Sequence, residues 1–271
     1  MAFVPAGFPI QPEAACSPSR GEVAIRAFLF DTYGTVCDFF RPLQRAFEGF
    51  ARGRGIAIDA ERLAIEWRNA YARSTFLHAG FGLPFRPLKE IHRENLLALL
   101  EPSAVPTTEE IVTLLSAWNR LDPWPDVVEG LRRLKRAAII APLSNGNFDD
   151  MVQLARHADL PWDIVLGASV AGAYKPHPDI YRKSVEALCL RPQQVCMVAA
   201  HQVDLAYAAG HGMQTAFVIR RDEFGGATKP KDAANPEEWL AAAEVYPEGD
   251  WTFVAEGFLD LAEQVRPFCA G

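Results

Sequence analysis

Cysteine is scarce in this chain and forms no pattern. The 271 residues include five cysteines, an odd number without a Cys-x-x-Cys pair: Cys16, Cys37, Cys189, Cys196 and Cys269. Disulfide scaffolds are shorter and richer in cysteine, and structural zinc sites need closely spaced ligands. The sequence therefore favours reduced thiols in a cytoplasm and gives no sign of a zinc site.

Long apolar runs and clusters of positive charge are also missing. No apolar stretch approaches the ~20 residues that a transmembrane helix needs, and the net charge is −7 at pH 7. We therefore expect neither a membrane nor a nucleic acid as partner. Residues 1–22 contain several prolines and no charged stretch followed by a sustained apolar one, so we expect an extension with little regular structure and no signal peptide.

Five short apolar runs predict buried strands, and helical patterns separate them. The strands are expected at residues 25–30, 138–143, 164–168, 194–199 and 215–219, and the helices at residues 127–136, 148–158, 179–188 and 203–210. Strands that alternate with helices predict an α/β fold with a Rossmann-like, doubly wound parallel sheet.

The interval from residue 38 to residue 122 has a different pattern. It shows no convincing strand and four helical stretches, at residues 42–54, 60–78, 88–100 and 108–118. A helical insert directly after the first strand predicts a cap over the carboxyl end of that strand. The expected organisation is an extension over 1–22, a catalytic core over 23–37 and 123–271, and a helical cap over 38–122.

Asp31 is the candidate nucleophile. It ends the apolar run Phe28–Phe30, and a Gly34-Thr35 turn follows. This places a carboxylate at the carboxyl end of a buried strand, where open α/β sheets carry their ligands. A helix cap or a turn aspartate is the structural alternative. Tyr33 stands where a phosphate-transferring enzyme needs a second acid, which favours a leaving group that departs as an anion.

Two further sites of polar residues follow later strands or loops. Ser144-Asn145-Gly146 ends the second strand and can hydrogen-bond a carboxylate or an oxyanion, although the same tripeptide is common in turns. Lys175 precedes Pro176 and is predicted on a loop, where its charge would keep Asp31 ionised. A solvated surface lysine is the alternative interpretation.

Asp204 follows the fourth strand and is a candidate to orient or deprotonate a water. Its alternative is an acid that stabilises a helix N-terminus. His201 either contacts the site or is structural, and Tyr181 is an orienting phenol or a core residue. Arg68 borders an apolar helical stripe that includes Trp67, and periodicity alone favours a surface salt bridge for it.

In their order along the chain, these motifs resemble those of the haloacid dehalogenase superfamily, over residues 25 to about 221: nucleophile, Ser-Asn, Lys-Pro, acid. Within it the chain is most similar to the L-2-haloacid dehalogenases (type II). Their nucleophile motif reads Asp-x-Tyr-Gly-Thr, as Asp31 to Thr35 do. Their halide-binding arginine follows a tryptophan in the first long cap helix, as Arg68 does, and a tyrosine stands six residues after the Lys-Pro lysine, as Tyr181 does.

The chain departs from this family before the last acid. The dehalogenases carry a serine and an asparagine where this chain has Ala199 and His201. The family's asparagine helps to place water, so His201 takes that task or reshapes the halide pocket. Magnesium-dependent phosphatases have an aspartate at the position of Ala200. The site is thus short of oxygen ligands for a hard cation, and we expect no metal ion and no other cofactor.

The resemblance implies hydrolysis of small 2-haloacids, such as L-2-haloacids or haloacetate, to 2-hydroxyacids through an Asp31 ester. The catalytic residues would be Asp31, Arg68, Lys175 and Asp204, and the substrate-binding residues Tyr33, Thr35, Ser144, Asn145, Tyr181 and His201. A small haloacid and a halide ion are the expected ligands. Whether fluoroacetate is among the substrates depends on the halide pocket.

Other functions stay open at this point. A phosphatase or another small-molecule hydrolase on the same fold is the main alternative, since a fold does not fix its chemistry. A non-catalytic protein that binds small acids or a partner is a third class. Members of the family often form dimers, and the apolar cap helices would permit a homodimer.

Overall fold

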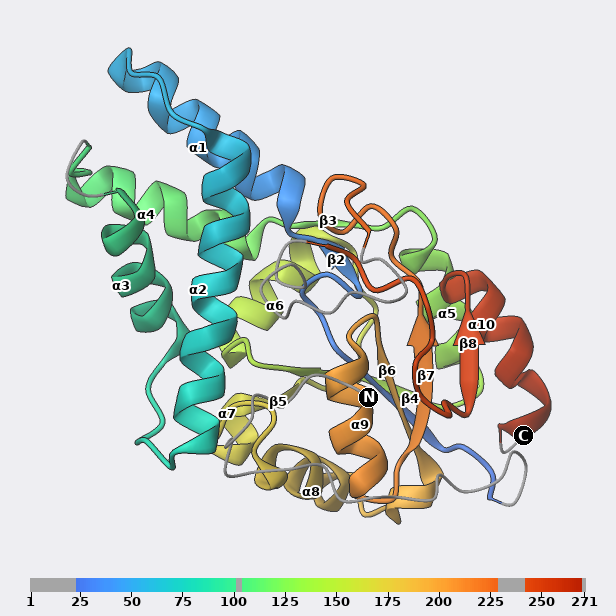
Figure 1. Ribbon diagram of the computed structural model, residues 1–271. Helices are drawn as coiled ribbons and strands as arrows, with labels where there is room; N and C mark the ends of the chain where they lie inside the picture. Colours follow the sequence, from blue (N-terminus) through green and yellow to red (C-terminus); the bar gives the residue numbers. More distant parts are fainter. Residues whose placement is uncertain (1–22, 101–103, 229–241, 270–271) are drawn as a thin grey trace.

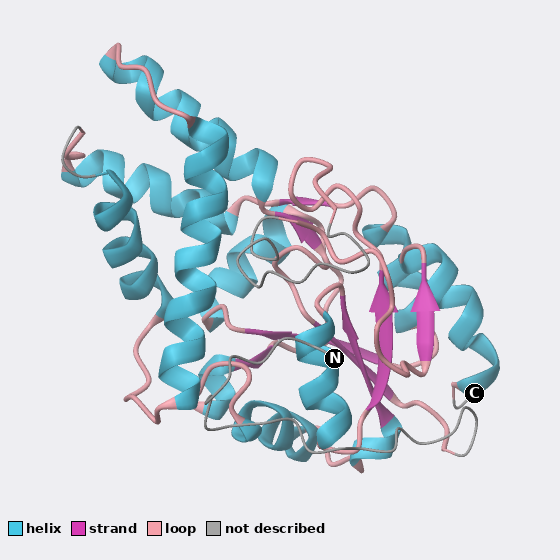
Figure 2. Cartoon of the chain, viewed as in Figure 1, coloured by secondary structure: helices cyan, strands magenta, loops and turns pink. Residues whose placement is uncertain are grey.

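The structure is a computed structural model that describes residues 23–100, 104–228 and 242–269. The predicted extension over residues 1–22 lies outside the described residues. The described residues form two parts: a sheet with helices packed around it, and a separate group of helices beside it (Figure 2).

A six-stranded parallel sheet forms the centre of the larger part, so the predicted fold class is confirmed. Its strand order is β5-β4-β1-β6-β7-β8. Every residue of β1, β6 and β7 is buried, which explains why these strands appear in the sequence as unbroken apolar runs. The strands are β1 (Ala27–Phe30), β4 (Ile139–Ser144), β5 (Leu166–Gly167), β6 (Val195–Ala199), β7 (Gln214–Val218) and β8 (Phe253–Ala255).

Helices cover both faces of this sheet. On one face α5 and α10 pack against each other, and on the other α8 contacts β4 and β5 while α9 contacts β6 and β7 (Figure 1). The helices of this part are α5 (Val127–Lys135), α6 (Phe148–His157), α7 (Ala168–Ala171), α8 (Pro178–Ala187), α9 (Gln202–Gly210) and α10 (Phe258–Val265). The strand β8 is not among the predicted elements, because an apolar run of three residues carries no usable periodicity. The helix α10 is not among them either, although Phe258, Leu261 and Val265 recur at helical spacing.

The helical group contains the four predicted helices, with local sequence signals at their ends. Asp59 caps α2 by accepting the N–H of Arg62, and Thr107 and Glu110 form a capping box on α4. The helices are α1 (Phe40–Arg54), α2 (Ala60–Gly80), α3 (Leu88–Leu100) and α4 (Thr108–Ser116), followed by the 3-10 helix η1 (Ala117–Asn119). Its longest member, α2, lies between α3 and the sheet (Figure 1).

A second, two-stranded sheet joins the two ends of the helical group. Its strands β2 (Cys37–Asp38) and β3 (Asp122–Pro123) pair antiparallel. Strands of two residues have no pattern that a sequence could reveal. The pair lies at the predicted limits of the cap, although the division of the chain into two domains stays a prediction. None of the helices in the described ranges has the length and apolar character that a bilayer crossing requires.

Candidate active site

The candidate site lies where the order of the sheet reverses. From β1 the chain continues to β4 on one side and later to β6 on the other, and α/β sheets bind ligands at such a reversal. Asp31 follows β1, Ser144 ends β4, and Asp204 lies in the first turn of α9, after β6. The parallel strands thus bring together residues that are far apart in the sequence.

The Asp31 carboxylate is held by three donors and is 15 % exposed. Its Oδ1 accepts from Lys175 Nζ at 3.1 Å, and its Oδ2 accepts from Thr35 Oγ1 at 2.7 Å and lies 3.0 Å from His201 Nδ1. Burial alone would raise the pKa of Asp31. Lys175, His201 and Thr35 outweigh burial and hold that pKa well below its usual range, so Asp31 is ionised near neutral pH.

Lys175 lies between two carboxylates. Its Nζ is 3.1 Å from Asp31 and 2.5 Å from Asp204, and its backbone N–H donates to Asn145 Oδ1 at 2.8 Å. Burial works against the charge of Lys175, but the two carboxylates outweigh it and raise the pKa of the amine. Asn145 therefore fixes the backbone from which this buried cation extends.

Asp204 differs electrostatically from Asp31. It accepts from Tyr181 Oη at 2.7 Å as well as from Lys175. Burial raises the pKa of Asp204 and the nearby charge of Asp31 adds to this rise, while Lys175 opposes it. Two carboxylates that share one cation thus have pKa values shifted in opposite directions, which is the arrangement expected of a nucleophile paired with a base.

His201 connects Asp31 to a carboxylate that the sequence analysis does not single out, Glu223. His201 Nε2 lies 2.7 Å from Glu223 Oε1 and 3.2 Å from Arg68 Nη2. Burial would lower the pKa of His201, but Glu223 and Asp31 outweigh it and raise the pKa to about 10. Glu223 is 1 % exposed and lies in the loop after β7. The sequence gives one signal for Glu223: it lies beyond the carboxyl end of the strand predicted at residues 215–219.

Arg68 points inward from α2, contrary to the surface salt bridge that periodicity alone favours. Its side chain is 14 % exposed, and Glu223 Oε1 lies 3.9 Å from it. The guanidinium carbon lies 5.7 Å from the ring centre of Phe39 and 5.3 Å from that of Phe224. Contacts of this kind with aromatic faces stabilise a cation by ~0.5–2 kcal/mol each, so Arg68 has a preformed place beside His201.

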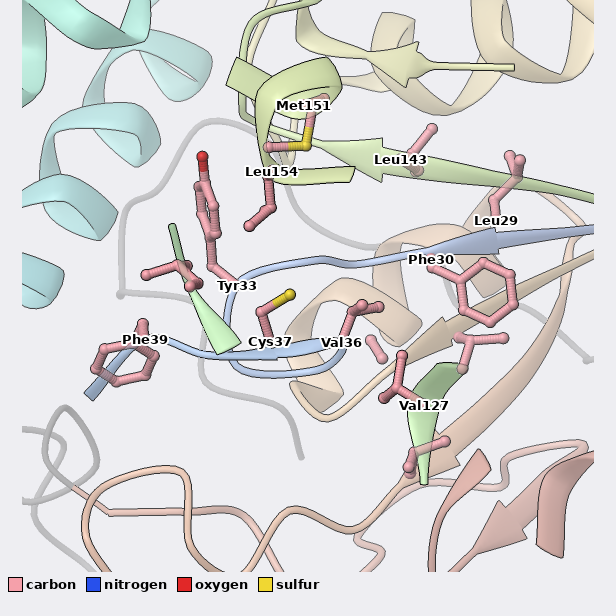
Figure 3. Packing of buried hydrophobic residues seen from close by; sticks show 14 of the residues in the cluster. Leu29, Phe30, Tyr33, Val36, Cys37, Phe39, Val127, Leu143, Met151 and Leu154 are labelled. Atoms are coloured by element: carbon pink, nitrogen blue, oxygen red, sulfur yellow. The ribbon is translucent and has the colours of Figure 1, made fainter. Parts of the chain in front are cut away.

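Tyr33 packs into an aromatic group instead of facing solvent. It is 5 % exposed, and its ring contacts those of Tyr71 and Trp118 at 5.8 and 5.2 Å between centres. Figure 3 shows it close to Met151 and Leu154. Burial raises the pKa of Tyr33 well above its usual value. Tyr33 therefore lacks the acidity that a phosphatase requires at this position.

Gly34, in the turn after Asp31, could not be another residue for two reasons: its backbone conformation and the lack of space for a side chain. Gly34 has a φ of +91°, and a Cβ there would collide with the Glu223 carboxylate and lie 3.2 Å from His201 Cε1. We expect Gly34→Ala to lower the free energy of unfolding by more than the ~1–2 kcal/mol that a left-handed backbone costs a residue with a Cβ. Urea unfolding measures this loss.

Gly82→Ala is the matched control, since Gly82 has a φ of +61° and open space around its missing side chain. It should show the backbone cost alone. Equal losses in the two variants would mean that the collision of the added Cβ with the Glu223 carboxylate costs no stability.

The loop before α9 holds the nucleophile turn through its backbone. The N–H of Ala200 donates to Thr35 Oγ1 at 2.8 Å, which aims the Thr35 hydrogen at Asp31. Ser144 Oγ accepts the N–H of Gly146 at 3.1 Å. Within the described ranges, no group of three or more His, Cys, Asp or Glu side chains is arranged to hold a metal ion.

Comparison with known proteins assigns the chain to a family. The family model for haloacid dehalogenase-like hydrolase matches residues 25–212. The (S)-2-haloacid dehalogenase 4A of Burkholderia cepacia is 32 % identical over 73 % of this chain and 84 % of its own length. The (S)-2-haloacid dehalogenase of Xanthobacter autotrophicus is 31 % identical over 72 % of this chain and 76 % of its own length.

Solved structures agree with this assignment. A defluorinating L-2-haloacid dehalogenase superposes with a TM-score of 0.82 at 34 % identity, over 93 % of this chain and 99 % of its own. The L-2-haloacid dehalogenase of Xanthobacter autotrophicus with chloropropionic acid covalently bound gives a TM-score of 0.72 at 27 % identity, over 89 % and 98 %. The chain therefore belongs to the haloacid dehalogenase-like hydrolases and, among them, to the (S)-2-haloacid dehalogenases.

Proposed function

We propose that this chain hydrolyses the carbon–halogen bond of small 2-haloacids through an ester on Asp31, without a metal ion or other cofactor. The observation that carries the proposal is the Asp31 carboxylate, kept ionised at the strand reversal by Lys175 and Thr35. The relative with chloropropionic acid covalently bound supports a covalent step, and Tyr33 fits a leaving group that needs no proton.

In the first step, Oδ1 of Asp31 attacks the carbon that bears the halogen. This oxygen has one donor, Lys175, whereas Oδ2 has two close partners and is less free to attack. The new C–O bond forms as the carbon–halogen bond breaks, and its electron pair leaves with the halide. Arg68 lies 3.2 Å from His201 and is the cation that stabilises the departing halide.

In the second step, a water hydrolyses the ester at Cγ of Asp31. Asp204 takes the proton of this water, in keeping with its raised pKa, and His201 helps to place the water. Thr35 donates to Oδ2, which has become the carbonyl oxygen. Collapse of the tetrahedral species breaks the bond from Cγ to Oδ1. The 2-hydroxyacid leaves with that oxygen and with the proton that Asp204 took from the water, which restores both carboxylates. Attack at carbon inverts it, so an L substrate yields a D product.

The remaining site residues support these groups. Asn145 and Tyr181 position Lys175 and Asp204 through the hydrogen bonds already described. Ser144 accepts from Gly146 and offers its own hydrogen to the substrate carboxylate. Tyr33, with its aromatic neighbours, would contact the alkyl part of the substrate.

We also place the protein in a cytoplasm, as a homodimer. Four cysteines in the described ranges are free thiols, which a reducing compartment preserves.

Leu77, Phe81 and Leu83 are each about half exposed or more near the end of α2, and an apolar patch of this kind fits a second copy. A monomer in sedimentation experiments would contradict the homodimer.

Halide release in the presence of EDTA tests the proposed function. We expect release from L-2-chloropropionate, because the proposed mechanism uses only side chains of this chain. Fluoroacetate is the second substrate, and the ratio of the two rates measures how well the halide pocket accommodates fluoride. Failure to release halide from either substrate, with phosphate release from esters only when magnesium is present, would replace the proposal by the phosphatase alternative.

A further inference from the structure

A buried carboxylate, Glu223, has no task in the mechanism above. We propose that Glu223 is a positioning residue that keeps His201 doubly protonated, so that His201 donates to Oδ2 of Asp31 while the ester is hydrolysed. The inference rests on the proposed function, since it assigns His201 a role within the ester mechanism.

The geometry around His201 favours one protonation pattern, because Glu223 Oε1 lies closer to Nε2, at 2.7 Å, than Arg68 does, at 3.2 Å. His201 Nδ1 lies 3.0 Å from Asp31 Oδ2, and its Nε2 lies 2.7 Å from Glu223 Oε1. Ionised carboxylates only accept hydrogen bonds. A neutral imidazole would therefore turn an unprotonated nitrogen toward one of the two oxygens, whereas the imidazolium donates to both.

The charges around His201 require a group such as Glu223. Three elements bring charged groups to the ring: Asp31 from the end of β1, Arg68 from α2 and Glu223 from the loop after β7. Arg68 is a permanent cation 3.2 Å from Nε2 and disfavours a second positive charge. Asp31 cannot balance the charge of His201 by itself, because it is already paired with Lys175. Without Glu223, His201 would lose its proton to relieve the repulsion from Arg68.

The fold holds Glu223 firmly in this place. Its loop is tied to the nucleophile turn by Arg220, whose Nε donates to the carbonyl of Thr35 at 2.9 Å and whose Nη1 donates to Asp126 at 2.8 Å. Gly34 leaves the space that the carboxylate occupies. Glu223 is thus built into the turn that carries Asp31 and Thr35.

The charged donor matters most in the second step. When water attacks Cγ of the ester, an electron pair moves onto Oδ2, and its negative charge develops between Thr35 Oγ1 and His201 Nδ1. Complete loss of such a donor typically slows a reaction by about 10²–10³-fold, and a neutral imidazole is a weaker donor than the imidazolium. In the first step Oδ2 loses charge instead, so the same donor gives no comparable advantage there. The ester should therefore accumulate when His201 is neutral.

Glu223→Gln in the full chain tests the proposal with L-2-chloropropionate. We expect a burst of about one halide per enzyme, a steady rate about 10²-fold lower, and an ester on the peptide that contains Asp31, detected by mass spectrometry. The wild-type rate should persist until the pH approaches about 10, the raised pKa of His201. The variant's rate should fall at lower pH, because deprotonation of His201 then replaces the charged donor to Oδ2 by a weaker neutral one in the rate-limiting step.

Two further variants make the outcome decisive. Glu244→Gln is the control: this carboxylate accepts the N–H of Gln202 at 2.9 Å and touches none of the reacting groups, so its variant should show neither burst nor altered pH profile. His201→Gln keeps a neutral side chain and should also accumulate ester, even if Glu223→Gln does not fold. Turnover by both Glu223→Gln and His201→Gln without ester accumulation would overturn the proposal. No halide from the wild type would instead refute the proposed function.

Discussion

Asp31→Asn is expected to abolish halide release, with a fall of about 10⁴-fold or more. The variant keeps the shape of the side chain and can still contact Lys175 and Thr35, but its neutral amide cannot attack a carbon centre to form the ester. Halide release from L-2-chloropropionate measures the loss. Asp122→Asn is the control, because Asp122 is half exposed and forms a surface ion pair with Arg45. It should leave the rate unchanged.

A single turnover in heavy-oxygen water separates the ester mechanism from direct hydrolysis. Water attacks Cγ of Asp31 in the proposed mechanism, so the label should enter Asp31 and be absent from the first product molecule. Mass spectrometry of the Asp31 peptide and of the hydroxyacid measures both. Label in the first product would mean that water attacks the substrate carbon directly, and Asp31 would then be a base.

Lys175→Met is expected to abolish activity and to lower the free energy of unfolding by about 3–5 kcal/mol. Lys175 is buried between Asp31 and Asp204. Removal of this cation leaves two carboxylates facing each other. Asp204, whose pKa is already raised, then retains a proton, and the base that hydrolyses the ester is lost. Urea unfolding at neutral pH, together with halide release, measures both effects.

The stability loss of Lys175→Met should depend on pH with a definite sign. The pKa of Asp31 is lowered in the folded wild type, so Asp31 contributes stability above its unfolded pKa of about 3.9 that is lost as the pH falls through the folded pKa. The variant lacks this contribution, and Asp204 gains no compensating partner. The deficit should therefore keep its full size from neutral pH down to about pH 4 and shrink only as the pH falls further, toward the folded pKa of Asp31.

Lys135→Met is the matched control for this measurement. Lys135 is paired with Asp163 at 2.8 Å, and both side chains are more than a third exposed. Exposed pairs contribute about 0–1 kcal/mol, so this variant should lose little stability at either pH. A loss as small in Lys175→Met would mean that the buried cation has no net effect on folding.

Much of the site follows from the sequence because of where strands end. The apolar runs of β1, β4 and β6 end close to Asp31, Ser144 and Asp204, and a parallel sheet places such ends on one edge. The alternation of strands with helices predicts that sheet without knowledge of any contact. The order of the motifs along the chain was therefore enough to propose a nucleophile, its cation and its base.

The tertiary structure alone decided which way Arg68 points and which group faces His201. Arg68 borders the apolar stripe of α2, and its direction depends on the rings of Phe39 and Phe224, which belong to distant segments. Glu223 lies in a loop without periodicity, and its place depends on the space left by Gly34. Strand ends are fixed by local pattern, whereas side-chain direction and loop conformation depend on packing between remote segments, which the order of residues does not display.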